Sequence, residues 1–170
     1  GTALPGEYEE LALLHTAVLA VCGFLAPKGV PCTLERLVPA VGAMSRRPLA
    51  LGDLQRMVAI DNELALRAHV SRDEDRASAI TKTQPEIILR RAERMALSAG
   101  TVRARQRRFR QLLMEHFRGH AVPEGAAHPP LPLAPLPAGL FDVVQSAQSP
   151  VHSNGGGPSC CTDAVAVSVG

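Results

Sequence analysis

The order of the hydrophobic periods in the first half of the chain constrains the fold more than any other sequence feature. Apolar residues recur every three or four positions in three successive segments, 8–25, 34–44 and 51–62. That spacing gives each segment one apolar stripe along a helix, so three consecutive helices are predicted. From Leu64 to Val70 the period changes to two, which is the pattern of a half-buried strand.

The predicted strand has a candidate partner in the residues that follow it. The charged stretch 71–76 is suited to a hairpin tip, and the weakly patterned segment 77–83 can return beside the first strand. Three helices followed by a short β-hairpin is the order of a winged helix-turn-helix. We therefore predict a mainly α, winged-helix-like domain with further helices at its flank, over 84–100 and 101–120.

The helix predicted over 101–120 combines arginine with apolar residues. One face carries Phe109, Leu113 and Phe117 and is expected to pack on the domain. The opposite face is either a solvated surface or a cationic surface for phosphate or an acidic partner. The candidate contact residues on this helix and on the one before it are Arg90, Arg91, Arg94, Arg103, Arg107 and Arg110.

The overall charge limits how these arginines can act. A formal net charge of +2 is too small for the whole chain to behave as a polycation, so DNA binding has to come from this local cluster. No aromatic residues interleave with the arginines as base-stacking platforms. We expect weak, sequence-independent DNA affinity at most.

The composition changes after the last predicted helix. Prolines are dense from about residue 121, and proline prevents regular helix and internal strand. Farther on the chain is rich in glycine and serine, a composition poorly suited to packing. We predict one domain over 1–133, followed by a disordered tail or linker over 134–170.

The sequence offers little for catalysis, metal binding or membrane insertion. Its four cysteines form no CxxC motif, so buried or incidental thiols are favoured over a zinc site. His116 and His120 have the spacing of two metal ligands, but their helix supplies no third ligand. No phosphate loop or nucleophile elbow is present. The apolar run 11–26 is short for a membrane span. We expect no enzyme activity, no metal, no cofactor and no membrane contact.

Several of these stretches, taken in order, resemble a known family. The start "LPGEYEELALL" resembles the "LP-x-x-Y-x-x-L" entry to the central domain of the DNA replication licensing factors of the Cdt type. The middle, "TLERLVPAVGAMSRR" followed by "LQRMVAIDNELALR", is similar to the second helix, third helix and first wing strand of that domain. The closing "RRFRQLLMEHFRGHAVPEG" resembles the plant and algal forms. The resemblance covers about residues 4–133.

This resemblance implies a nuclear winged-helix domain without catalytic activity. The family helps to load the minichromosome-maintenance helicase at replication origins marked by the origin recognition complex. In animals the same domain binds geminin, and the entry region contributes to that contact. Carried over to this chain, the implied partner-binding residues are Pro5, Tyr8 and Leu11.

A winged-helix transcription regulator that binds duplex DNA is the alternative function. The segment 51–62 would then be the helix that enters the major groove. Its charge is near neutral or negative, which favours protein binding over groove insertion. The polar residues on which this comparison depends are Asp53, Gln55, Arg56, Asp61 and Asn62.

Overall fold

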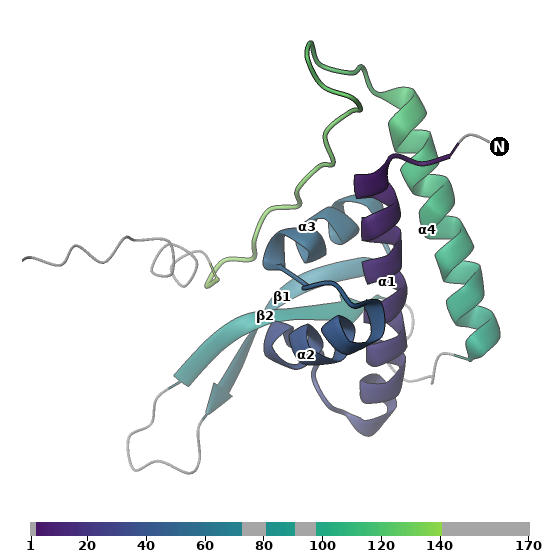
Figure 1. Ribbon diagram of the computed structural model, residues 1–170. Coiled ribbons are helices and arrows are strands. Elements are labelled where there is room, and N and C mark those ends of the chain that lie inside the picture. The colour runs from purple at the N-terminus through teal and green to yellow at the C-terminus, as the bar shows by residue number, and fades with distance from the viewer. Residues whose placement is uncertain (1–2, 73–80, 91–97, 141–170) are drawn as a thin grey trace, which may run out of the picture.

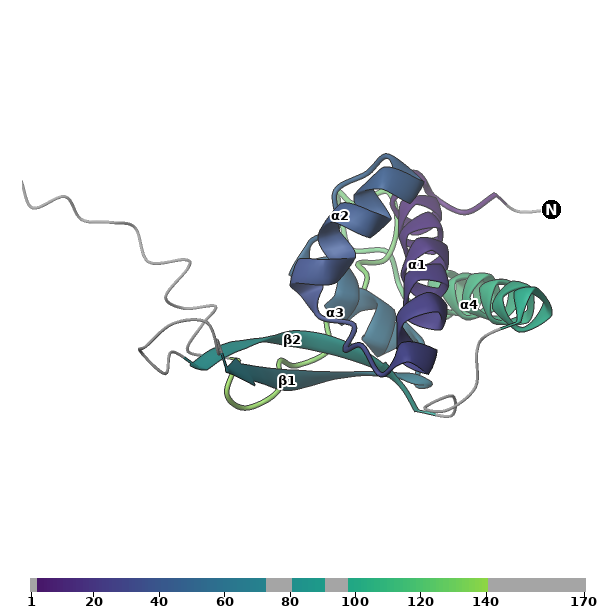
Figure 2. The same ribbon diagram turned by 90° about the horizontal axis from the view of Figure 1, so that it is seen from below.

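The computed structural model describes residues 3–72, 81–90 and 98–140. The elements in order are α1 (Gly6–Leu25), η1 (Ala26–Lys28), α2 (Leu34–Ser45), α3 (Leu51–Ile60), β1 (Leu64–Arg72), β2 (Thr81–Leu89) and α4 (Ala99–Gly119). Figures 1 and 2 show α1 at the centre, with α2 and α3 on one side of it and α4 on the other. The hairpin of β1 and β2 packs against α2 and α3. The predicted mainly α, winged-helix-like fold with a hairpin is confirmed.

The central helix α1 begins and ends where its sequence favours it. Pro5 occupies the N-cap position, and Glu7 and Glu9 lie in the first turn, where carboxylates interact favourably with the helix dipole. At the other end, η1 is followed by Gly29 in the left-handed conformation, with φ of 68°. Glycine adopts this conformation at little cost, so the chain can turn back here toward α2.

The helices α2 and α3 form as predicted, with one difference in which residues they bury. Pro39 lies inside α2 without ending it, and the helix continues to Ser45. Of the predicted stripe, Leu37 and Val41 are buried, whereas Val38 and Met44 are exposed. Only part of this stripe therefore faces the core, and Val38 and Met44 lie at its exposed edge.

The hairpin is confirmed, but its second strand lies later in the chain than predicted. β1 and β2 pair antiparallel with Leu64 opposite Leu89 and Arg67 opposite Glu86. The helix predicted over 84–100 is wrong for residues 84–89, which belong to β2, and residues 91–97 lie outside the described part of the chain. Proline near a helix start misled the prediction, because an edge strand also tolerates proline.

A continuous aliphatic core joins these elements. It contains residues from α1, α2, α3, the inner end of the hairpin and α4, and its largest fully buried side chains include Tyr8 and Phe109. Leu64 is buried beside the helices, whereas Val70, farther along β1, is exposed. The inner part of the hairpin therefore belongs to the core, and its outer part projects beyond it, as Figure 1 shows.

After α4 the chain returns across the domain as an extended segment, residues 121–140, which we call the return segment (Figure 1). Ala134 N donates to Gln55 O of α3 at 3.1 Å, and Gln55 Nε2 donates to Ala134 O at 2.9 Å. Leu131 and Leu140 are buried. Residues 121–140 therefore pack on the domain, and most of the tail predicted over 134–170 lies outside the described residues.

Candidate interaction surfaces

The three residues that the family resemblance marks as partner-binding lie at the N-terminal end of α1. Pro5 is half-buried, whereas Tyr8 and Leu11 are buried in the core. The Tyr8 hydroxyl donates a hydrogen bond to the carbonyl oxygen of Pro129 at 2.9 Å. Burial, with a smaller contribution from the Glu7 carboxylate, raises the pKa of the Tyr8 hydroxyl, which therefore remains a donor.

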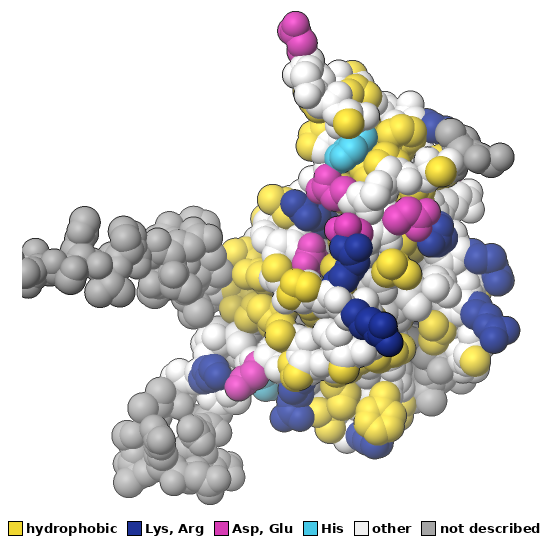
Figure 3. All heavy atoms as spheres, viewed as in Figure 1, with side chains coloured by type: hydrophobic (Ala, Val, Ile, Leu, Met, Phe, Trp, Pro, Cys, Tyr) yellow, Lys and Arg dark blue, Asp and Glu magenta, His cyan; other side chains and the backbone are white. Residues whose placement is uncertain are grey.

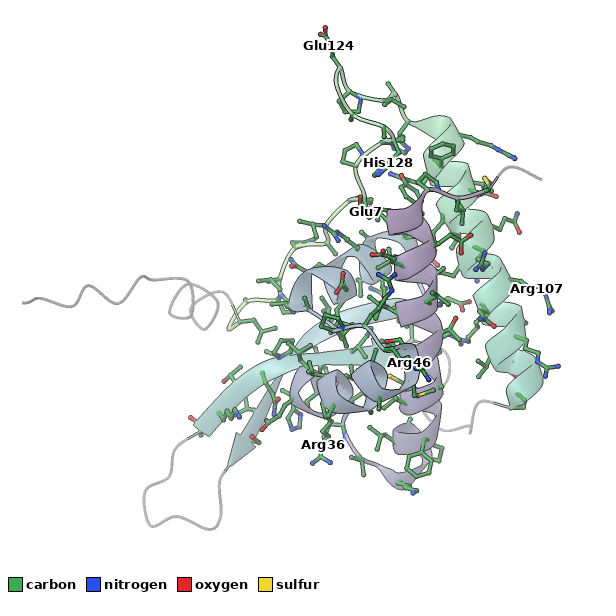
Figure 4. All side chains as sticks on the ribbon, in the orientation of Figure 1. Glu7, Arg36, Arg46, Arg107, Glu124 and His128 are labelled. Carbon is green, nitrogen blue, oxygen red and sulfur yellow. The ribbon has the colours of Figure 1, made fainter. Side chains whose placement is uncertain are left out.

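The ring of Tyr8 is enclosed by aromatic side chains from two other segments. Phe117 of α4 and His128 of the return segment both contact it edge-on, with ring centroids 5.8 and 5.5 Å away. Above it, His128 Nε2 lies 3.4 Å from Glu7 Oε2, and Figure 4 shows these two side chains facing each other. Tyr8 therefore holds the return segment onto α1 and α4, and the accessible surface there belongs to Pro5, Glu7 and His128.

The arginines of α4 divide into paired and unpaired groups. Arg110 forms a two-point ion pair with Glu9 of α1, with distances of 3.0 and 2.6 Å. Arg105 and Arg108 both contact Glu63 in the turn between α3 and β1, at 3.3 and 2.7 Å. These three arginines hold α4 against the domain, so Arg110 belongs to the fold rather than to a free cationic face.

Arg103 and Arg107 are the unpaired members of the predicted set on α4. Both are exposed, and neither forms an ion pair with any described residue. Figure 4 shows Arg107 pointing away from the rest of the fold, and Figure 3 shows basic side chains along the outer edge of α4. These two residues remain available to an anionic partner.

The remaining predicted arginines precede α4. Arg90 is exposed at the end of β2, where its backbone N–H donates to Glu63 O at 2.8 Å. It lines a cavity of about 290 Å³ together with Asn62, Glu63 and Arg108. Arg90 therefore lies beside α4, although not on the preceding helix that we predicted. Arg91 and Arg94 lie outside the described residues.

A groove between α1 and α2 escaped the sequence analysis. It has a volume of about 440 Å³, and its walls include Val21, Leu25 and Ala40. Phe24 and Met44 also line it and are 64% and 57% exposed. Figure 3 shows apolar side chains gathered at this end of the molecule. Phe24 lies outside the predicted stripe of α1, which was the available signal, since an apolar residue off the stripe is expected to face solvent.

A buried polar pair connects the middle of α1 to the residue that follows α3. His15 Nε2 lies 3.2 Å from Asp61 Oδ2 and therefore donates to it, and the His15 ring stacks on Phe109 of α4 at 3.7 Å between ring centroids. Burial lowers the pKa of His15 despite the opposing effect of Asp61. Burial alone would raise the pKa of Asp61, but hydrogen bonds from His15 and Glu63 N–H hold it below its usual value. This pair joins α1, α3 and α4.

The two histidines with metal-ligand spacing each form a hydrogen bond to a backbone carbonyl oxygen. His116 Nε2 lies 3.1 Å from Pro130 O, and His120 Nδ1 lies 3.0 Å from His116 O. A carbonyl oxygen only accepts, so each of these ring nitrogens donates. Over the described residues, no group of three or more His, Cys, Asp or Glu side chains is placed to hold a metal ion.

The length and composition of the segment from Gly6 to Lys28 would allow it to cross a membrane. Half of its most apolar window is buried inside the fold, however, and α1 packs against α2, α3 and α4. A core helix of a folded domain meets the same criteria of length and hydropathy. The contacts of α1 therefore favour its interpretation as the central core helix.

The fold and its surfaces define a small helical module with a β-hairpin, whose accessible features are an apolar groove and unpaired arginines. A comparison with protein families adds the particular family. The model described as DNA replication factor CDT1 like matches residues 4–120, well over half of the chain and every helix and strand described here. The chain belongs to this family, which supports a role in DNA replication. A search of curated proteins found no match.

Proposed function

We propose that this chain is a non-enzymatic, nuclear interaction domain that supports loading of the minichromosome-maintenance helicase at replication origins. The observation that carries this proposal is the family match over residues 4–120, which includes all of α1 to α4. The partners are then the origin recognition complex, the helicase and, where the organism has it, geminin. No cofactor is needed, because the domain acts by bringing proteins together.

The N-terminal end of α1 is the proposed protein-contact surface. Tyr8 and Leu11 act from the interior by holding α1, α4 and the return segment together. Pro5, Glu7 and His128 form the part that a partner can reach. Pro5 then contacts the partner directly, whereas the buried Tyr8 and Leu11 position this surface.

The transcription-regulator alternative is disfavoured by the contacts of α3. Its predicted recognition residues are already engaged: Gln55 bonds to the return segment, and Asp61 bonds to His15. Arg56 lies 3.6 Å from Asp53 and 3.7 Å from Glu7, and Asn62 accepts from Arg108 at 3.3 Å. A helix that reads bases needs such side chains free to reach the major groove.

A pull-down from nuclear extract with the full chain tests the protein-contact proposal. Pro5→Glu places a carboxylate at a helix N-terminus, where it is tolerated, while changing the accessible surface. We expect recovery of origin-recognition and helicase subunits by the unmodified chain and a loss of at least about fivefold, roughly 1 kcal/mol, with Pro5→Glu. Pro135→Glu, an exposed position of the return segment, is the matched control and should recover them normally. Recovery of transcription proteins instead would overturn the proposal.

A salt titration of duplex DNA binding tests the arginine surface. Arg103→Ala combined with Arg107→Ala should weaken binding equally for all sequences and reduce the slope of log affinity against log salt by about 2 units. Arg110→Ala is the control, because its guanidinium is already paired with Glu9, and it should change the slope less. Strong preference for one sequence, or an unchanged slope in the double variant, would contradict weak nonspecific binding.

A further inference from the structure

Two cysteines near the C-terminal end of α1 line one cavity, which is separate from the apolar groove between α1 and α2. Cys22 is in the last turn of α1, and Cys32 is in the loop before α2. The turn at Gly29 returns the chain so that both cysteines line the same cavity. Both are free thiols, with 1% and 6% of their surface exposed. Two buried free thiols that share one cavity wall are candidates for covalent linkage.

A cavity gives small molecules a path to both thiols. Its volume is about 440 Å³, it is partly open to solvent, and both cysteines line it. Its polar wall consists of Glu86 with Arg67, bonded at 2.9 and 3.0 Å, and His69 Nδ1 at 3.3 Å from the same carboxylate. The polar groups of these side chains already interact with one another. The sulfur atoms are therefore the reactive groups that the cavity presents.

The two thiols differ in reactivity. Cys32 lies in a loop and is 6% exposed, whereas Cys22 lies inside α1 and is 1% exposed. The interaction with Cys22 lowers the pKa of Cys32, although burial and Glu86 oppose it, and the same interaction, followed by burial, raises the pKa of Cys22. Since the thiolate is the nucleophile, Cys32 is the attacking residue and Cys22 the resolving residue.

We propose that Cys22 and Cys32 are an oxidation site at which a hydroperoxide converts the adjacent thiols lining this cavity into an intramolecular disulfide. The Cys32 thiolate attacks the peroxide and breaks its O–O bond, which gives a sulfenic acid and, from hydrogen peroxide, water after protonation. Cys22 then attacks the sulfenic sulfur, and a second water leaves. Two thiols lose two electrons and two protons, and the peroxide is reduced by two electrons.

The disulfide would fasten the end of α1 to the segment that supports the hairpin. Cys32 O accepts a hydrogen bond from Ile87 N at 3.1 Å, and the adjacent Thr33 bridges to Glu86 of β2. The linkage therefore restrains α1, the loop and the inner hairpin together. We expect oxidation to raise the melting temperature by roughly 5–10 °C.

Peptide mapping tests the site directly. The full chain with Cys160→Ser and Cys161→Ser retains only the two thiols of interest. Lys28 lies between them, so trypsin separates their peptides, 1–28 and 29–36, unless a disulfide holds them together. After treatment of the folded protein with hydrogen peroxide, we expect the linked pair, with a mass lower by two hydrogens, and its release by dithiothreitol. Absence of the linked peptide, or links only between molecules, would overturn the proposal.

Single variants test the order of the two steps. With Cys22→Ala, the sulfenic acid on Cys32 has no resolving thiol and should be trapped by dimedone. With Cys32→Ala, Cys22 should be labelled at least about tenfold more slowly, because its side chain is only 1% exposed and burial still raises its pKa. Equal labelling of the two variants would overturn the assignment of Cys32 as the attacking residue. A melting temperature that does not rise on oxidation would overturn the restraint of the hairpin.

Discussion

The two ends of α1 differ sharply, although both carry an aromatic residue. At the N-terminal end Tyr8 is fully buried beneath α4 and the return segment. At the C-terminal end Phe24 is 64% exposed, and the Lys28 ammonium lies 3.6 Å from its ring centroid. One end is therefore closed by the chain's own later residues, while the other presents an apolar groove and the cysteine cavity.

This difference shows what sequence position alone cannot tell about a motif. The entry motif marks Tyr8, but its hydroxyl bonds to a residue 121 positions away in the chain. The Tyr8 hydroxyl therefore serves packing first. Phe24 carries no motif, yet it is the aromatic residue of α1 that solvent reaches. Substitutions of Tyr8 at the closed end and of Phe24 at the open end test this difference, when the free energy of unfolding is measured for both.

The largest effect is expected from Tyr8→Ala. Removing a fully buried aromatic ring leaves a cavity and frees the return segment, so the free energy of unfolding should fall by about 3–5 kcal/mol. Urea denaturation of the full chain, followed by circular dichroism, measures this change. A loss below about 1 kcal/mol would mean that the closed end contributes little to the fold.

Tyr8→Phe separates the ring from its hydroxyl. It retains the contacts with Phe117 and His128 but removes one of the two donors to Pro129 O, the other being His128 Nδ1 at 3.1 Å. We expect a loss of about 1 kcal/mol in the same denaturation experiment. A loss as large as that of Tyr8→Ala would show that the hydrogen bond, rather than ring burial, closes this end.

The middle of α1 should make stability depend on pH. The pKa of His15 is lower in the folded chain than the usual 6.5, mainly because of burial, so the unfolded chain binds the extra proton first. The contribution of His15 to the free energy of unfolding is therefore fully present above pH 6.5. This free energy falls as the pH drops below that value. Arg105, which faces His15, disfavours the charged ring further.

Denaturation at pH 7.5 and pH 5 measures this dependence. His15→Gln keeps a side-chain donor for Asp61 but cannot titrate, so its stability should change less between the two pH values. His120→Gln is the control for an exposed histidine and should retain the full dependence. A steeper fall in His15→Gln than in the unmodified chain would contradict the burial argument.

The regions predicted correctly are those where local pattern and tertiary packing agree. The stripe of α1 matches the side that the fold buries, so this helix followed from period alone. The alternation from Leu64 also gave the strand β1, although only Leu64 of the alternating set is buried and Val70 is exposed. Residues 84–89 were predicted as helix because Pro85 and a short apolar run suit either structure. Only the pairing of Glu86 with Arg67 distinguishes them, and that contact is not local.

The candidate sites show the same limit. Helical spacing correctly placed Arg103, Arg107 and Arg110 away from the apolar face of α4, but it could not show that Glu9 neutralises Arg110. It also gave no sign that Cys22 and Cys32 line one cavity, since this arrangement depends on the turn at Gly29. Charges and thiols acquire their roles from partners that lie on other elements.

The smallest effect is expected at the open end of α1. Phe24→Ser removes a ring that is 64% exposed, so the free energy of unfolding should change by no more than about 0.5 kcal/mol. The matched substitution Tyr8→Ser should cost several kcal/mol in the same urea titration, at about the level expected for Tyr8→Ala. If Phe24→Ser were destabilising by more than about 1 kcal/mol, the Phe24 ring would contribute to the core rather than to an open surface. The two ends of α1 would then be equally closed, and the groove beside Phe24 would be an internal surface of the chain.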